Sequence, residues 1–330
     1  MGYNKQDYIR IKAEFSEKYL HAQARAKERR LELYARIPEV RELDAVLSRT
    51  GMDILAVINS GGTDVDGKIT EVRQRNEQLL QQRDALLVAN GYPADYSDIQ
   101  YECDKCADTG FVETKMCDCM KRALVEAGYE SSGLGSLIRT QSFDNFSLKY
   151  YQGGGANAET METTVAELRK FAEQFDRHTY RNYLLIGGTG LGKTHLSTAV
   201  AKTVIERGFD VLYVTAVGMF RDFEAKQFER GAGMKNDPER YEEADLLIID
   251  DLGTEVTNQF TLSCLYDVLN ARINCHRSTF INTNLASREL LMRYHERITS
   301  RLFGEYKAIL FAGTDIRRQK IQKNATGKGE

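Results

Sequence analysis

The stretch that decides the fold is Tyr183-Leu-Leu-Ile-Gly-Gly-Thr-Gly-Leu-Gly-Lys-Thr194, an apolar run followed by a glycine-rich loop. Its last eight residues fit the pattern GxxxxGK[ST], which is specific when a strand precedes it and a helix follows. Glycines let backbone amides turn inward around an anion, and the amino end of the following helix adds positive potential. The sequence therefore predicts a phosphate-binding loop made of Gly187, Gly188, Thr189, Gly190, Leu191, Gly192, Lys193 and Thr194.

A second apolar run, Ala244-Asp-Leu-Leu-Ile-Ile-Asp-Asp251, ends in two carboxylates. Beside a phosphate loop, such a strand typically supplies a metal ligand and a group that acts on water. We expect Asp250 and the Thr194 hydroxyl to bind Mg²⁺, Lys193 to contact the β- and γ-phosphates, and Asp251 to orient or deprotonate water. Together the two stretches predict a nucleoside triphosphatase. ATP is favoured over GTP, although no residue specifies the base.

Around these stretches, apolar strands alternate with helices from about residue 160 to the end. Strands are expected at 183–186, 211–214, 246–249 and 279–282, with helices at about 160–175, 193–206, 217–230 and 258–275. This alternation predicts an α/β fold, a parallel sheet covered by helices on both faces.

Composition limits the remaining possibilities. The chain has 330 residues, 42% hydrophobic and 28% charged, with a net charge of −3. These values exclude a disordered chain and a generally basic polymer-binding protein, and the length suggests about two domains. No apolar run is long enough for a membrane helix, and the opening MGYNKQDYIR lacks the apolar core of a signal peptide. We expect a cytoplasmic protein without a membrane partner.

Residues 1–100 read as a helical module, with helices at 5–35, after Pro38 and at about 67–90. Residues 1–36 carry nine basic and five acidic side chains, a net charge of +4. Apolar side chains recur at helical spacing in each helix. Either these apolar seams pack on one another, or one seam or the basic face docks a partner protein; both can hold.

Four cysteines, Cys103, Cys106, Cys117 and Cys119, follow within residues 101–130. Four thiolates at close spacing suit tetrahedral Zn²⁺ in a closed, structural site, and free thiols or a redox pair are the alternative. Residues 131–158 are rich in glycine and serine, which is typical of a linker, and residues 159–330 then form the ATPase domain.

Several segments together resemble the AAA+ ATPases and, within them, the DnaC/DnaI-type replicative helicase loaders. The segments are GGTGLGKTHL (187–196), LLIIDDLGTE (246–255), TFINTNL (279–285) and RITSRL (297–302), preceded by CDKCADTG (103–110) and SFDNFSLKYY (142–151). The resemblance extends from the cysteines to the end of the chain. Transposition helpers of the IstB type share the same core.

The resemblance implies further roles. Asn284 is similar to sensor 1, which holds the attacking water or the γ-phosphate, and Asn282 is the second candidate for that position. Arg301 resembles an arginine finger that reaches into a neighbouring subunit. Arg317, or its neighbour Arg318, resembles sensor 2. The family usually has glutamate where this chain has Asp251, one methylene shorter, so Glu255 is a second candidate for acting on water.

The resemblance also implies the partners. They are the hexameric replicative helicase, single-stranded DNA, and further copies of the chain that assemble on ATP and DNA. Arg221, Lys226 and Arg230 are candidate phosphate contacts in the DNA track, whereas the neighbouring Phe220, Phe223 and Phe228 are expected in the core. The expected function is ATP-dependent helicase loading. The alternatives are an IstB-like transposition helper and an ATP-gated DNA-binding adaptor with little hydrolysis.

Overall fold

The computed structural model describes residues 3–50, 65–151, 156–176, 178–227 and 237–319. The chain forms two compact units. The sheet unit contains residues 1–11 and 121–330, and the helical unit contains residues 12–120. No helix in the described part of the chain is long and apolar enough to cross a membrane.

The sheet unit is built on one five-stranded sheet in the order β4-β5-β6-β3-β7. The strands are β3 (Asn182–Gly187), β4 (Val211–Thr215), β5 (Leu246–Leu252), β6 (Ser278–Thr283) and β7 (Tyr306–Phe311). All neighbouring strands are parallel. The predicted α/β P-loop fold is thereby confirmed, because helices connect the strands and β3, which leads into the phosphate loop, lies inside the sheet.

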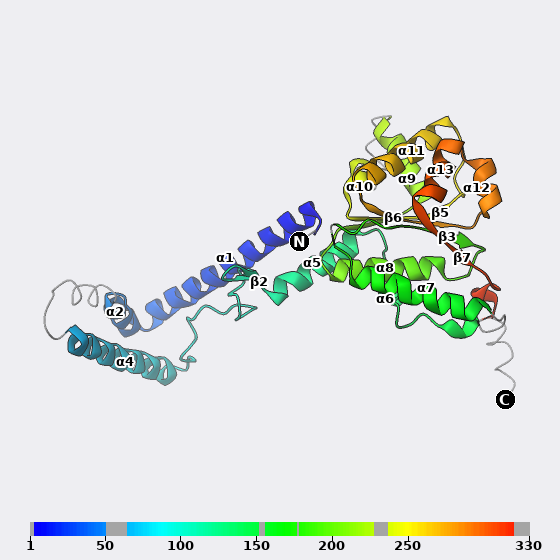
Figure 1. Cartoon of the computed structure of the whole chain (residues 1–330). Helices are drawn as coiled ribbons and strands as arrows, with labels where there is room; N and C mark the ends of the chain where they lie inside the picture. Colours follow the sequence, from blue (N-terminus) through cyan, green and yellow to red (C-terminus); the bar gives the residue numbers. More distant parts are fainter. Residues whose placement is uncertain (1–2, 51–64, 152–155, 177, 228–236, 320–330) are drawn as a thin grey trace. The chain divides into compact units, whose positions relative to one another are not determined.

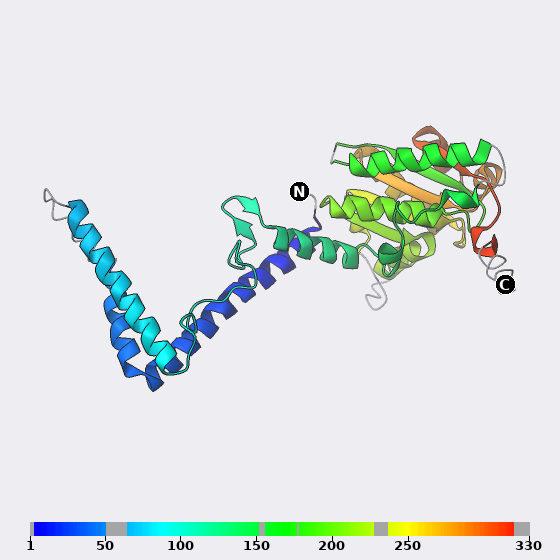
Figure 2. The same ribbon diagram turned by 90° about the horizontal axis from the view of Figure 1, so that it is seen from below.

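Helices cover both faces of this sheet (Figure 1). On one face α7 (Ala156–Glu173) and α8 (Lys193–Glu206) lie side by side (Figure 2). The other face carries α9 (Ala216–Gln227), α10 (Glu239–Glu243), α11 (Gln259–Asn274), α12 (Ser287–Arg293) and α13 (Glu296–Gly304). Side chains alternate along β5, so Leu246 and Ile248 pack on the α8 side while Leu247 and Ile249 pack on the other. Asp250 continues this alternation on the α8 side.

The segment expected to be a linker contributes to the core of the sheet unit. It contains α6 (Leu137–Thr140) and a short 3₁₀ turn, η1 (Leu148–Tyr150). Leu134, Ile138, Phe143 and Tyr151 are all buried in the cluster on the α8 side. The physical reason is that apolar residues recur between the glycines and serines, so the segment gains more by packing than by staying extended.

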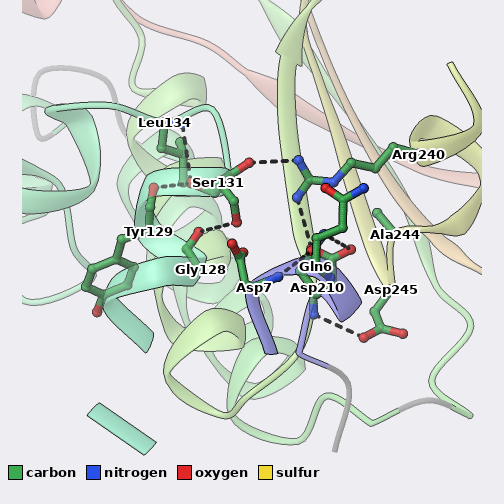
Figure 3. A network of polar contacts seen from close by, with 12 residues as sticks. Gln6, Asp7, Gly128, Tyr129, Ser131, Leu134, Asp210, Arg240, Ala244 and Asp245 are labelled. Atoms are coloured by element: carbon green, nitrogen blue, oxygen red, sulfur yellow. Dashed lines mark hydrogen bonds and ion pairs between the residues drawn. The ribbon is translucent and has the colours of Figure 1, made fainter. Parts of the chain in front are cut away.

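The beginning of the chain also packs on the sheet unit. Helix α1 runs from Lys5 to Arg36, and its first residues lie where β4 begins. Figure 3 shows the contacts: the Arg240 guanidinium donates to the Ser131 carbonyl (3.0 Å) and pairs with Asp210 (3.2 Å). The Asn4 amide reaches the same carboxylate at 3.5 Å. Burial raises the pKa of Asp210, and the charge of Arg240 opposes that shift.

The helical unit combines the rest of α1 with α2 (Pro38–Leu47) and α4 (Val65–Ala89). A small core of Leu33, Ile37, Val40 and Leu87 joins the three helices, so the apolar seams pack on one another. Arg83 adds a polar tie, because its Nε lies 2.8 Å from the Asp44 carboxylate. A hairpin of β1 (Phe111–Val112) and β2 (Lys115–Met116) follows, and α5 (Asp118–Ser131) leads into the sheet unit.

Candidate nucleotide site

The phosphate loop begins at the last residue of β3, Gly187, and ends at the second residue of α8, Thr194. Gly187, Gly190 and Gly192 have φ of +156°, +74° and +86°, which only glycine adopts without strain. A Cβ at Gly192 would lie 2.7 Å from the Tyr151 hydroxyl, so both space and conformation require glycine there. That hydroxyl also donates to the Leu191 carbonyl at 2.6 Å, which fixes the loop against the segment before it.

Lys193 connects the loop to the ends of β5 and β6. Its ammonium donates to the carbonyls of Gly187 (2.6 Å) and Gly188 (2.8 Å) and to Asn284 Oδ1 (2.8 Å). The Asn284 amide in turn donates to Asp251 Oδ1 at 3.2 Å. Three residues far apart in the sequence therefore meet at the carboxyl edge of the sheet, where ligands bind in α/β folds.

A β-bulge turns both aspartates toward this edge. The β5–β6 pairing shifts by one residue between Ile249 and Leu252, and Asp251 has φ of +54°. In a regular strand, consecutive side chains point to opposite faces, so only one aspartate could face the loop. The extra residue re-aims the Asp251 side chain toward Asn284.

The Asp250 carboxylate receives four hydrogen bonds. Its Oδ2 accepts from the hydroxyls of Thr194 (3.1 Å) and Tyr213. Its Oδ1 accepts from the Asn282 amide at 2.8 Å and from the backbone amide of Asp251 at 3.0 Å. Oxygen donors are the ligands that Mg²⁺ prefers, so the hydroxyl and carboxylate side by side at the end of the loop fit this ion.

Charges within the site act on one another. Burial, followed by the negative charge of Asp250, raises the pKa of Asp251. Burial lowers the pKa of Lys193, the charges of Asp250 and Asp251 oppose this shift, and the cation of Arg317 adds to it. Arg317 thus acts electrostatically on Lys193 and Asp251, whereas its neighbour Arg318 is 85% exposed and lies 4.0 Å from Asp315. Both arginines are exposed, and the charge of Arg317 favours it over Arg318 as the sensor 2 candidate.

Glu255 is held by a separate network. Its carboxylate accepts from the Tyr294 hydroxyl and from the Gly253 amide at 2.8 Å, and its side chain is buried. Arg293 donates to the Glu255 carbonyl. Both oxygens of the Glu255 carboxylate are therefore hydrogen-bonded within the protein, and these bonds hold the loop after β5 in place. Asp251, joined to Asn284 and only half-buried, is better placed to act on water.

Arg301 lies on α13 among residues of α11. Its guanidinium lies over the Tyr266 ring, 4.5 Å from the centroid, and donates to Asn270 Oδ1 at 2.8 Å. Among the described residues no hydrogen bond joins Arg301 to the phosphate loop or to the paired aspartates. Within one chain, Arg301 is therefore not brought together with the other site residues.

The four cysteines of the helical unit do come together. The Sγ atoms of Cys103 and Cys117 are 3.9 Å apart, those of Cys106 and Cys119 are 3.5 Å apart, and all four lie within 4.8 Å of one another. Zinc–sulfur bonds of about 2.3 Å require sulfur separations of about 3.8 Å in a tetrahedron. The backbone amide of Cys106 and the neighbouring thiols lower the pKa of Cys103 to about 7, whereas burial raises the pKa values of Cys106 and Cys119.

The candidate DNA segment is only partly described. Phe220 is buried and Phe223 stacks on Tyr241, so both belong to the core as expected. Arg221 is exposed, but the Lys226 ammonium is paired with Asp237 (2.9 Å) and Glu239 (3.1 Å). Arg230 lies outside the described residues.

Comparison with known families fits this geometry. Residues 147–297 match the family model described as IstB-like ATP binding protein. This region is an IstB-like ATP-binding domain. With the phosphate loop, the lysine and the paired aspartates, the domain is a P-loop ATPase.

Individual proteins similar to this chain share less than 30% of its aligned residues. The replicative helicase loader DnaC of Escherichia coli K12 is 21% identical over 196 residues, covering 59% of this chain and 76% of that protein. The phage-like element PBSX protein XkdC of Bacillus subtilis is 27% identical over 249 residues, covering 70% of this chain and 89% of that protein. Crystal structures of the DnaC helicase loader and of DnaI align with TM-scores of 0.43 and 0.45 at 20% and 19% identity. They cover 52% and 56% of this chain, and 98% and 94% of those chains.

The sequence reasoning missed two tyrosines of the IstB-like domain. Tyr213 donates to Asp250, and Tyr151 donates to the phosphate loop. Each carries a polar atom into a buried apolar environment, where a hydroxyl needs a partner. The sequence shows this for Tyr213, the one hydroxyl-bearing ring in the apolar strand Val211-Leu-Tyr-Val-Thr215. It does not show which residue accepts the hydrogen bond.

Proposed function

We propose that this chain is an ATP-dependent loader of the replicative DNA helicase, which binds ATP with Mg²⁺ and single-stranded DNA when replication begins. The observation that carries the proposal is the similarity to proteins named replicative helicase loader DnaC, which extends over 76% of their length. The juxtaposition of Lys193, Asn284 and Asp251 supports it, because a loader of this kind needs a working ATPase.

Hydrolysis would use the side chains at the carboxyl edge of the sheet. Lys193 neutralises charge on the β- and γ-phosphates, Asn284 orients the attacking water, and Asp251 accepts its proton. Thr194 and Asp250 would hold Mg²⁺, which supplies positive charge at the phosphate oxygens. Arg317 adds a cation on the same side of the loop.

Assembly would complete the site. In our proposal, copies of the chain associate on ATP and DNA, and Arg301 of one copy reaches the nucleotide of the next. Its position away from the phosphate loop of its own chain is consistent with this arrangement. The helical unit would bind the helicase, and the four cysteines would hold Zn²⁺ as a structural ion within that unit.

The test uses the full chain and the purified hexameric helicase. We expect the two to co-elute on size exclusion with ATP and Mg²⁺, and single-stranded DNA to stimulate ATP hydrolysis. Lys193→Ala is expected to lose ATP binding while keeping its unfolding midpoint within a few degrees. A wild-type chain that neither binds ATP nor co-elutes with the helicase would overturn the proposal.

A second candidate is favoured by the family model, whose description is IstB-like ATP binding protein. IstB-like proteins are similar to this chain in the ATPase domain, and a transposition helper would bind a transposase instead of the helicase. The same elution experiment with the transposase of an IS21-type element separates the two. Helicase loading that persists undiminished in Asp251→Asn would instead favour an ATP-gated adaptor with little hydrolysis.

A further inference from the structure

Three adjacent strands each present one polar side chain to the first residues of α8. They are Tyr213 of β4, Asp250 of β5 and Asn282 of β6. In the β4–β5 register Thr215 pairs with Asp250, and Tyr213 lies two residues earlier on the same face. A tyrosine side chain is long enough to span that diagonal, and it places its hydroxyl on Asp250 Oδ2.

The Tyr213 hydroxyl is a fixed donor to this carboxylate. Its side chain is buried, and its hydroxyl donates directly to Asp250 Oδ2. Thr194 donates to the same Oδ2 at 3.1 Å. The Asn282 amide donates to the other oxygen and to Ser197 Oγ at 2.9 Å, which ties that side of the carboxylate to α8.

The backbone of Tyr213 is also held in place. Strand β4 forms one edge of the sheet, and the free edge is covered because the Tyr213 amide donates to the Ser132 carbonyl at 2.7 Å. A Cβ at Gly133 would lie 2.4 Å from the Tyr213 carbonyl, so the two backbones touch. The neighbouring Ser131 is fixed in turn by Arg240 (Figure 3). The hydroxyl therefore projects from a backbone position that is fixed on both sides.

We propose that Tyr213 is a positioning residue for magnesium binding: its hydroxyl holds the Asp250 carboxylate in the orientation that serves the ion. This inference rests on the proposed role of Asp250 as a magnesium ligand. A carboxylate on a strand end can rotate about its side-chain bonds, and each rotation away from the Thr194 hydroxyl separates the two oxygens that the ion needs. Hydrogen bonds to a ligand from outside the metal's own shell typically improve metal affinity or activity by about 10- to 100-fold.

The experiment is a magnesium titration of the full chain at a fixed ATP concentration, followed by calorimetry. For Tyr213→Phe we expect the half-saturating Mg²⁺ concentration to rise at least about tenfold, while ATP affinity in the presence of a chelator stays within about twofold. If Tyr213 has a purely structural role, Tyr213→Phe should instead weaken ATP binding equally with Mg²⁺ and with the chelator.

Tyr241→Phe is the matched control. Tyr241 is also buried in the same unit and donates its hydroxyl to an aspartate, Asp222, but it belongs to α10 on the other face of the sheet. It should lose similar stability without changing the magnesium dependence. On an Asp250→Asn background, Tyr213→Phe should produce no further shift, because the hydroxyl acts through that carboxylate.

The outcomes separate this inference from the proposed function. Wild-type protein that binds ATP with no dependence on Mg²⁺ would remove the premise about Asp250. If ATP binding by the wild type depends on Mg²⁺ but Tyr213→Phe has the same half-saturating Mg²⁺ concentration, the role of Tyr213 alone is overturned. If Tyr213→Phe does not fold, Tyr213→Met lacks the same hydroxyl, fills the space with a flexible side chain and should show the same shift.

Discussion

Asp251 occupies a left-handed backbone position that few side chains tolerate. Its φ is +54°, and short polar residues such as aspartate and asparagine enter this region far more readily than longer ones. The bulge needs this conformation to direct the side chain to Asn284. The conformation therefore gives a physical reason for aspartate where the resembling family usually has glutamate.

Replacing the charge while keeping the backbone tests this assignment. Asp251→Asn should retain ATP affinity and lower kcat by at least about 100-fold, the usual size of a lost general base. Glu255→Gln should instead lower the unfolding midpoint, because it disturbs the bonds to Tyr294 and Gly253, and keep most of kcat in the folded protein. Steady-state kinetics and parallel thermal unfolding check both variants. A large loss of kcat in Glu255→Gln, with kcat kept in Asp251→Asn, would make Glu255 the base.

The raised pKa of Asp251 also has a signed effect on stability. Between the ordinary value of 3.8 and the raised value, the folded protein keeps a proton that the unfolded chain has lost. The folded state binds more protons there, so the free energy of unfolding falls as pH rises through this window. Hydrolysis should change in the opposite direction, because only the ionised carboxylate accepts a proton from water.

Urea unfolding at a series of pH values measures the effect on stability. The wild type should show the loss with rising pH, and Asp251→Asn, which has no titrating group at this position, should lack that part of it. A pH–rate profile of the wild type should have its acid limb above pH 3.8. Identical pH dependence of stability in both proteins would contradict the shift.

At the scale of elements, one buried arginine joins α10, α11 and the start of β6. Arg272 of α11 is fully buried and donates to the carbonyls of Tyr241 (3.0 Å), Ala244 (2.9 Å) and Ser278 (2.6 Å). Arg272→Met would leave several buried carbonyls without donors, at a cost of about 1–3 kcal/mol for each unsatisfied group. We expect a loss of at least about 3 kcal/mol in urea unfolding, whereas exposed Arg221→Met should change little.

The cysteine hairpin makes a second prediction for an element. Strands β1 and β2 have two residues each, too few to be stable on their own, so we expect the hairpin to depend on the proposed zinc site. Metal analysis of the purified chain should find about one zinc ion per molecule. Cys103→Ser combined with Cys106→Ser should remove it and expose the hairpin to proteolysis, and unchanged zinc content would contradict the site.

The predictability of the elements follows from their local patterns. Strands β3 to β6 and helices α1, α8 and α11 lie within a few residues of the ranges read from periodicity, because each buries an apolar run or face. The core role of residues 134–151 was missed, since composition alone cannot distinguish a linker from a packed irregular segment. Strand β7 was missed because three of its six residues are exposed, which interrupts the apolar pattern.

The candidate site also has parts that the sequence predicts and parts that only the structure shows. The phosphate loop and the paired aspartates depend on residue types at fixed spacing, so the sequence alone predicts them. The choice of Asp251 over Glu255, and of Arg317 over Arg318, depends on a bulge and on through-space charges. Those relations join residues as far apart in the sequence as Lys193 and Arg317, and no local pattern contains them.

For the whole molecule, the position of Arg301 predicts that activity depends on assembly. Arg301→Ala should lower kcat by about 10³-fold or more while leaving ATP affinity unchanged, as for an arginine finger. Mixing Arg301→Ala with Lys193→Ala should then restore part of the activity, because a shared site could combine an intact loop from one chain with an intact finger from another. Specific activity that is equal in dilute and concentrated wild type would argue against a shared site.

The sheet unit draws on two separate parts of the chain, residues 1–11 and 121–330. A shortened protein that begins after the cysteines would leave the surface around Gly208 and Asp210 without Tyr3 and Asn4. Likewise, a fragment that ends near residue 130 would leave the start of α1 and the end of α5 without the rest of the sheet unit. An affinity tag at either end of the chain would be attached to the nucleotide-binding unit, so each tagged protein should be compared with untagged protein in ATP binding.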